Sequence, residues 1–77
     1  MKLWEYSGKH IKIIDIDGRM HIGLVELYTS EFDEPDGVAT ISLRPDGTNG
    51  YLVDFTEDEI ASIEVLPAVL PVIAEAV

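Results

Sequence analysis

The chain has no cysteine among its 77 residues, and it has only five lysine and arginine residues against fifteen aspartate and glutamate residues. Without cysteine there can be no disulfide and no thiolate zinc site, which are two common supports of very small domains. The formal net charge of −10 repels phosphate backbones and anionic lipid surfaces. These shortages argue against sequence-independent nucleic-acid binding and against a membrane surface as a partner.

Long apolar runs are also lacking. No stretch approaches the ~20 apolar residues that cross a bilayer, and no secretion signal opens the chain, so we expect a cytoplasmic protein. A single domain over residues 1–77 buries only about 60% of its unfolded surface, which makes its own core marginal. Hydrophobic residues nevertheless make up 47% of the chain. The surplus indicates either a subunit interface or a sheet that is covered on both faces.

Residues 8–29, GKHIKIIDIDGRMHIGLVELYT, predict two long strands joined by a tight turn. The pair Asp17-Gly18 between the two runs is a strong hairpin signal. Gly23 interrupts the second apolar run, which predicts a bend or a bulge there, and a bent second strand is how a small sheet curls into a barrel. The apolar side chains recur with a period close to two, at Ile11, Ile13, Met20, Ile22, Leu24 and Leu27.

Residues 30–37, SEFDEPDG, predict an acidic loop, and a third strand follows over residues 38–44. In that strand Ala39, Ile41 and Leu43 share one face, which we expect to lie in the core.

Residues 45–50, PDGTNG, predict a turn that leads to a fourth strand containing Leu52-Val53 and Phe55. Thr56 to Glu59 matches a capping box, for which one helical turn is enough. A fifth strand is predicted over residues 60–66.

The two ends of the chain are apolar. Leu3, Trp4 and Tyr6 are expected to lie across one end of the barrel, with Trp4 in the core or in an interface. In the apolar tail over residues 67–77, Pro67 and Pro71 exclude a continuous central strand, and Pro71 favours the start of a short C-terminal helix. The tail has three open interpretations, which are folding back on its own barrel, docking on a neighbouring subunit, and disorder.

Residues 8–66 resemble the Sm-like (LSm and Hfq-related) fold. The segment GKHIKIIDIDGRMHIGLVELY is similar to the first Sm motif, with Gly18, Gly23 and Tyr28 in matching places, and YLVDFTEDEIASIEVL is similar in layout to the second. The resemblance implies an all-β fold, a small five-stranded, strongly bent antiparallel barrel. It also implies that the fourth strand of one subunit pairs with the fifth strand of the next, closing a ring of about five to seven copies.

The RNA-binding residues of that family do not carry over to this chain. Thr29 follows Tyr28 where the family has an aspartate, the third strand VATISL has no asparagine, and FTEDEI replaces the Arg-Gly element with acids. A ring of such subunits would carry a charge of about −50 to −70, which further disfavours RNA.

Other chemistry finds little support in the sequence. His10 and His21 flank the first hairpin and can be imagined to share a metal, but no third ligand and no nucleophile pattern accompanies them. The acidic residues of the loop over residues 30–37 do not have the spacing of a calcium loop. We therefore predict no catalytic residue, no metal site, no cofactor and no enzymatic activity.

The leading hypothesis is a non-catalytic, homo-oligomeric ring that acts as a scaffold or binds a protein partner. The alternative is a single-stranded RNA-binding protein, with Arg19, Tyr28 and Arg44 as contacts. A metal-dependent enzyme is a third and weaker hypothesis. The predicted subunit interface consists of apolar residues on the fourth and fifth strands, namely Leu52, Val53, Phe55, Ile60, Ile63 and Val65.

Overall fold

A computed structural model describes residues 2–67 as one five-stranded antiparallel sheet with two short 3₁₀ turns. The strand order is β4-β3-β2-β1-β5, so β4 and β5 are the two outer strands. The prediction of an all-β fold with five antiparallel strands is confirmed. The elements are η1 (Leu3–Tyr6), β1 (His10–Asp15), β2 (Met20–Thr29), β3 (Thr40–Pro45), β4 (Val53–Thr56), η2 (Glu57–Glu59) and β5 (Ile60–Val65).

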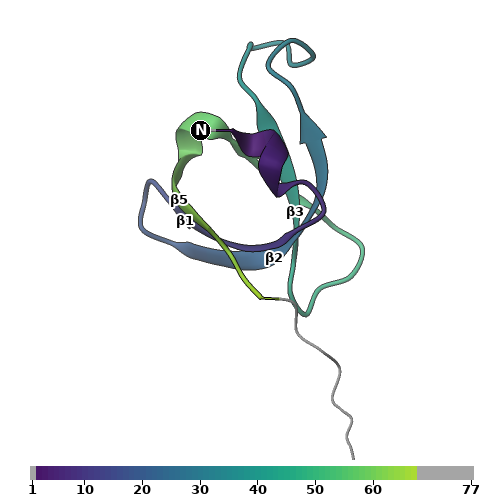
Figure 1. The fold of residues 1–77 in the computed structure, drawn as a ribbon, viewed down its shortest axis with the longest axis vertical. Helices are drawn as coiled ribbons and strands as arrows, with labels where there is room; N and C mark the ends of the chain where they lie inside the picture. Colours follow the sequence, from purple (N-terminus) through teal and green to yellow (C-terminus); the bar gives the residue numbers. More distant parts are fainter. Residues whose placement is uncertain (1, 68–77) are drawn as a thin grey trace, which may run out of the picture.

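The sheet is strongly curved but is not closed by its own hydrogen bonds. Figure 1 shows the strands winding around a common interior, with β2 sweeping through the longest arc and η2 turning the chain from β4 into β5. Within residues 2–67, β4 pairs only with β3 and β5 pairs only with β1. The described part of the chain is therefore an open, curled sheet, and the closed barrel expected from the sequence is not observed.

The β1–β2 hairpin forms where the sequence predicts it. Gly18 has a φ of 84°, a left-handed conformation that costs glycine little. Asp15 fixes the turn, because its Oδ1 atom accepts hydrogen bonds from the backbone N–H groups of Asp17 and Arg19, each at 2.9 Å. A short polar side chain that bonds the backbone two residues ahead is a usual device of tight turns.

Gly23 is not the position of the bulge in β2, which was one of the two features predicted there. The register of β2 against β3 shifts between Val25 and Leu27, so the bulge lies two residues beyond the glycine. At Gly23 the backbone of β3 approaches so closely that an added Cβ atom would lie 2.1 Å from the carbonyl oxygen of Arg44. The glycine therefore permits a close approach of two strands.

The core lies on the concave face of the sheet. Ile41 and Leu43 of β3, and Ala39 just before it, are buried, as predicted, and Thr40 and Ser42 on the other face of β3 are buried as well. On β2, however, Val25 is buried while Met20 is 60% exposed, so the apolar alternation that begins at Met20 lies on the outer face. The buried apolar residues are Leu3, Ile11, Ile13, Val25, Ala39, Ile41, Leu43, Phe55 and Ile60.

The N-terminal turn packs against this core through Leu3 and, less deeply, through Tyr6. Leu3 of η1 is 1% exposed, whereas Trp4 is 55% exposed. The expectation that Trp4 lies in the core is therefore wrong for the described chain, because the geometry of η1 turns Leu3 inward. No helix within residues 2–67 is long and apolar enough to span a bilayer. The predicted C-terminal helix and nearly all of the apolar tail lie outside the described residues.

Candidate functional site

The outer strand β4 presents a free row of backbone groups. In an antiparallel pair, residues alternate between those that bond the neighbouring strand and those that point away from it. The backbone N–H of Glu57 donates to the carbonyl of Ala39, in register with the pairs Phe55↔Ile41 and Val53↔Leu43. The odd-numbered residues of β4 thus bond β3, and the N–H and C=O groups of Asp54 point toward the free edge.

The N–H of Thr56, which also points away from β3, has a local acceptor. Glu59 Oε1 accepts this hydrogen bond at 2.9 Å, which is the half of the predicted capping box that holds η2 against the end of β4. The other half of the box is present as well, because the Thr56 side chain accepts a hydrogen bond from the backbone N–H of Glu59, so the predicted capping box is confirmed. The Thr56 hydroxyl also donates to Asp58. The free edge therefore runs back from Asp54 toward Leu52, which lies one residue before β4 begins at Val53.

In the other outer strand, β5, the even-numbered residues bond the neighbouring strand and the odd-numbered residues point to the free edge. The backbone N–H of Leu66 donates to the carbonyl of His10, in register with the pairs Glu64↔Lys12 and Ser62↔Ile14. By the same alternation, the even-numbered residues of β5 bond β1. The N–H and C=O groups of Ile63 and Val65 therefore point toward the second free edge.

The six predicted interface residues divide into two groups. Phe55 and Ile60 are 5% and 7% exposed and belong to the core of the chain itself, so their side chains are not available to a neighbour. Val53 and Ile63 are half-buried and pack against the core. Only Leu52, at 46%, and Val65, at 48%, offer largely exposed apolar side chains at the two edges.

Asp15 links the first hairpin to the inner face of the sheet. Its Oδ2 atom lies 2.8 Å from His21 Nε2, and its side chain is only 13% exposed. The hydrogen bond from His21 and the backbone N–H of Arg19 together hold the pKa of Asp15 below its ordinary value. The imidazole of His21 also packs against the ring of Phe55, with 4.8 Å between the ring centroids.

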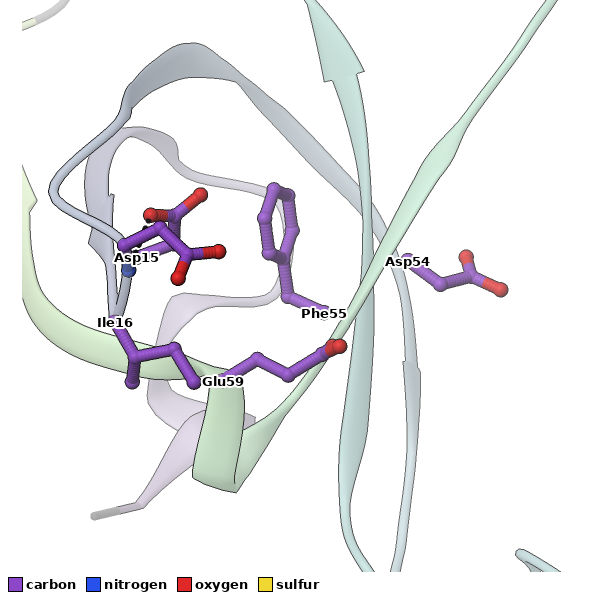
Figure 2. Close-up of a pocket in the computed structure, with 6 residues that line it drawn as sticks. Asp15, Ile16, Asp54, Phe55 and Glu59 are labelled. Atoms are coloured by element: carbon purple, nitrogen blue, oxygen red, sulfur yellow. Dashed lines mark hydrogen bonds between the residues drawn. The ribbon is translucent and has the colours of Figure 1, made fainter.

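A shallow hollow of about 130 Å³ opens beside this cluster, between the β1–β2 turn on one side and β4 and the end of η2 on the other. Figure 2 shows the ring of Phe55 turned toward Asp15, while Asp54 points away on the opposite side of β4. The opposed directions of these neighbouring side chains fit the alternation along the strand. The hollow is lined by Asp15, Ile16, Asp17, Asp54, Phe55 and Glu59.

The two histidines do not meet. His21 lies opposite Ile13 in the register of β1 and β2, on the core face, whereas His10 precedes the buried Ile11 and lies on the other face. His10 Nε2 is bound to both carboxylate oxygens of Asp46, at 2.8 and 3.0 Å. In the described part of the chain, no three histidine, aspartate or glutamate side chains are grouped so that they could hold a metal ion.

The structure does not bring the candidate RNA contacts together. Arg19 lies at the β1–β2 turn and Tyr28 near the far end of β2, separated by about 30 Å of strand at ~3.3 Å per residue. Tyr28 is half-buried against the core. Arg44 is paired with Glu26, with 2.8 Å between Nη1 and Oε2. These three residues form no common surface.

Sequence reasoning did not identify the two pairs of histidine with aspartate, His10 with Asp46 and His21 with Asp15. The position of Asp15, two residues before the turn residue Asp17, is a signal for the backbone part of this arrangement. The pair of His10 with Asp46 joins residues 36 positions apart and has no local signal.

Comparison of the chain with protein families, with curated protein sequences and with solved structures gives no match.

Proposed function

We propose that this chain is a non-catalytic module that assembles with copies of itself, edge to edge, into a closed ring of the Sm-like kind. The ring would act as a scaffold or bind a protein partner, and we place it in the cytoplasm. One observation carries the proposal. The strand order leaves β4 and β5 at opposite edges of the sheet, each with backbone groups that point away from the chain's own strands.

Free strand edges favour such an assembly. An unpaired edge is a template for pairing with another chain, and proteins commonly cover it. Because the two edges of this sheet differ, the contact between copies is head to tail, and a head-to-tail contact must close by rotation or propagate as a fibre. The curvature of the sheet in Figure 1 favours rotation between successive copies.

The size of the core supports the same conclusion. Nine buried apolar residues form the described core, while eight large apolar side chains are exposed over the same residues. A chain of this length without disulfides commonly relies on oligomerisation for stability. Leu52 and Val65 are among the exposed side chains, and each lies at one of the free edges.

RNA binding is the alternative function, and it has less support. Arg19, Tyr28 and Arg44 lie apart, and the guanidinium of Arg44 is engaged by Glu26. The net charge of −10 opposes the exchange of counterions that provides most of the affinity for RNA. Salt-sensitive binding of an oligouridine by the purified chain would favour this alternative.

Size-exclusion chromatography with light scattering tests the assembly. We expect a single closed species at micromolar concentration whose mass is an integral multiple of 8.5 kDa. A species of 8.5 kDa at every concentration would show that the proposal is wrong.

Two proline variants give this test a matched pair. Val65→Pro removes an N–H that points to the free edge, so the chain should fold but stay monomeric. Glu64→Pro removes an N–H that bonds β1, so it should destabilise the monomer itself. Circular dichroism distinguishes the two results. A Val65→Pro chain that is folded and still fully assembled would exclude β5 as the paired edge.

A further inference from the structure

We infer that the contact between copies has a single register, in which Leu52 of one copy lies opposite Val65 of the next and Asp54 lies opposite Ile63. This inference rests on the proposed edge-to-edge assembly and specifies which atoms meet in it. It follows from the parity of the two free edges, from the position of one proline, and from the exposure of two side chains.

The alternation of bonded and free backbone groups along each outer strand restricts the possible registers. In β4 the groups that point to the free edge belong to even-numbered residues, whereas in β5 they belong to odd-numbered residues. Residues opposite one another in a hydrogen-bonded pair must both point across the gap. An even-numbered residue of β4 must therefore lie opposite an odd-numbered residue of β5, so the allowed registers differ by steps of two residues.

Pro67 excludes the register that is shifted by two residues toward the C-terminal end of β5. If Asp54 lay opposite Val65, then Leu52 would lie opposite Pro67, which has no N–H to donate. The ladder would lose a hydrogen bond at the point where the short β4 strand can least spare one, because Thr56 already gives its N–H to Glu59.

The register that is shifted by two residues toward the N-terminal end of β5 leaves the side chain of Val65 without an apolar partner. With Asp54 opposite Ala61, Val65 would lie opposite Gly50, which has no side chain to pack against it. Val65 is 48% exposed in the single chain and would stay exposed in this arrangement.

The remaining register joins Val65 on β5 to Leu52, which directly precedes β4 and continues its alternation by one residue. Leu52 and Val65 are 46% and 48% exposed, and as opposite residues of a ladder they fall on the same face. Directly opposite Cβ atoms lie about 4.5 to 5.5 Å apart, so the two side chains would cover each other. Ile63, which is half-buried, would then lie beside Asp54 and continue the ladder.

The same register would also describe a hairpin within one chain, because η2 joins the end of β4 to the start of β5. In the described chain these two strands do not pair with each other. The experiment must therefore show that the paired residues come from different copies.

Cysteine cross-linking provides this test, because the natural chain has no cysteine. Two single variants, Leu52→Cys and Val65→Cys, are purified separately, mixed so that subunits exchange, and oxidised. A disulfide between them joins two different chains by necessity. We expect a covalent dimer in the mixture, at a yield at least fivefold above that of a control mixture of Leu52→Cys with Ile63→Cys. The control is shifted by two residues, which places its Cβ atoms about 7 to 8 Å apart, beyond ordinary disulfide reach.

The outcomes separate the register from the assembly. A chain that is monomeric by light scattering overturns the proposed function, and the inferred register with it. An assembled protein in which the control mixture cross-links as well as the test mixture, or in which neither does, overturns the register alone. The double variant Leu52→Cys/Val65→Cys tests whether the two strands pair within a single chain. If it closes a disulfide within one chain while the mixed single variants form no dimer, β4 and β5 pair within a single copy, and the inference is wrong.

Discussion

Replacing Gly23 by alanine should destabilise the chain far more than the small size of the change indicates. The added Cβ atom would lie 2.1 Å from the carbonyl oxygen of Arg44, 2.8 Å from its carbonyl carbon and 2.9 Å from the Cα atom of Pro45. All three are backbone atoms, so no flexible side chain can move aside. To restore an ordinary contact of 3.4 Å, β3 would have to withdraw from β2 by about 1.3 Å.

This displacement has a cost that can be estimated from the adjoining hydrogen bonds. The N–H of Asp46 lies 2.9 Å from the carbonyl of Ile22, and a shift of that size would break this bond and weaken the next one along the ladder. Each is worth about 1 kcal/mol net, and overpacking typically adds about 1 to 3 kcal/mol. Alanine loses less backbone entropy than glycine on folding, which offsets about 0.5 to 1 kcal/mol of this cost. We expect a net loss of about 2 to 4 kcal/mol.

The loss should be visible in both urea and thermal unfolding. A domain of this length has a free energy of unfolding of about 4 to 12 kcal/mol, so the midpoint temperature should fall by roughly 10 to 25 °C. Gly18→Ala is the matched control, because it makes the same chemical change at a φ of 84° where the added atom meets nothing within 4 Å. Its cost should be only about 1 kcal/mol, from the left-handed backbone. If Gly23→Ala were as stable as Gly18→Ala, the close approach of β2 and β3 would be refuted.

Two further predictions concern the first hairpin and the core. Because its hydrogen bonds lower the folded-state pKa of Asp15, this carboxylate stabilises the fold above about pH 4, and the contribution is lost as the pH falls through the folded-state value. Asp15→Asn should therefore be less stable than the natural chain by urea unfolding at about pH 7, and the difference should shrink at about pH 2.5; an unchanged difference would contradict this role. Ile41→Ala, at a fully buried position of β3, should cost about 2 to 5 kcal/mol in the same assay, whereas Leu27→Ala, at a position 54% exposed, should cost less than about 1 kcal/mol, and equal costs would contradict the assigned core.

Much of the fold could be predicted from the sequence because its signals are local. The Asp17-Gly18 turn, the acidic loop, the alternation of Ala39, Ile41 and Leu43, and the short turn after Thr56 depend on neighbouring residues only. Each of these features was found at its predicted place, within one or two residues. Such signals fix where strands begin, end and turn.

Features that depend on residues far apart in the chain could not be predicted in this way. Gly23 was expected to mark a bend or a bulge. The bulge lies elsewhere on β2, and the need for glycine is set by the backbone of Arg44, which is 21 positions away along the chain. Trp4 was expected in the core or in an interface, and it is not in the core of the described chain, because the geometry of η1 turns Leu3 inward. The burial of Phe55 and Ile60 was likewise not predicted, because an apolar residue on an outer strand can face either its own core or a neighbour.

The burial of Phe55 and Ile60 limits which groups of the outer strands β4 and β5 could contact another copy. Since Phe55 and Ile60 are used within the chain, the proposed interface would not be the broad apolar surface that the sequence indicated. What the outer strands offer is mainly backbone, with Leu52 and Val65 as the apolar side chains at their edges. Backbone pairing is directional, so it constrains the register more than an apolar surface does. Copies carrying a charge of −10 repel one another, and an interface built largely from hydrogen bonds must overcome that repulsion. The proposed assembly should therefore depend on ladder geometry at Asp54, Ile63 and Val65 more than on total apolar area.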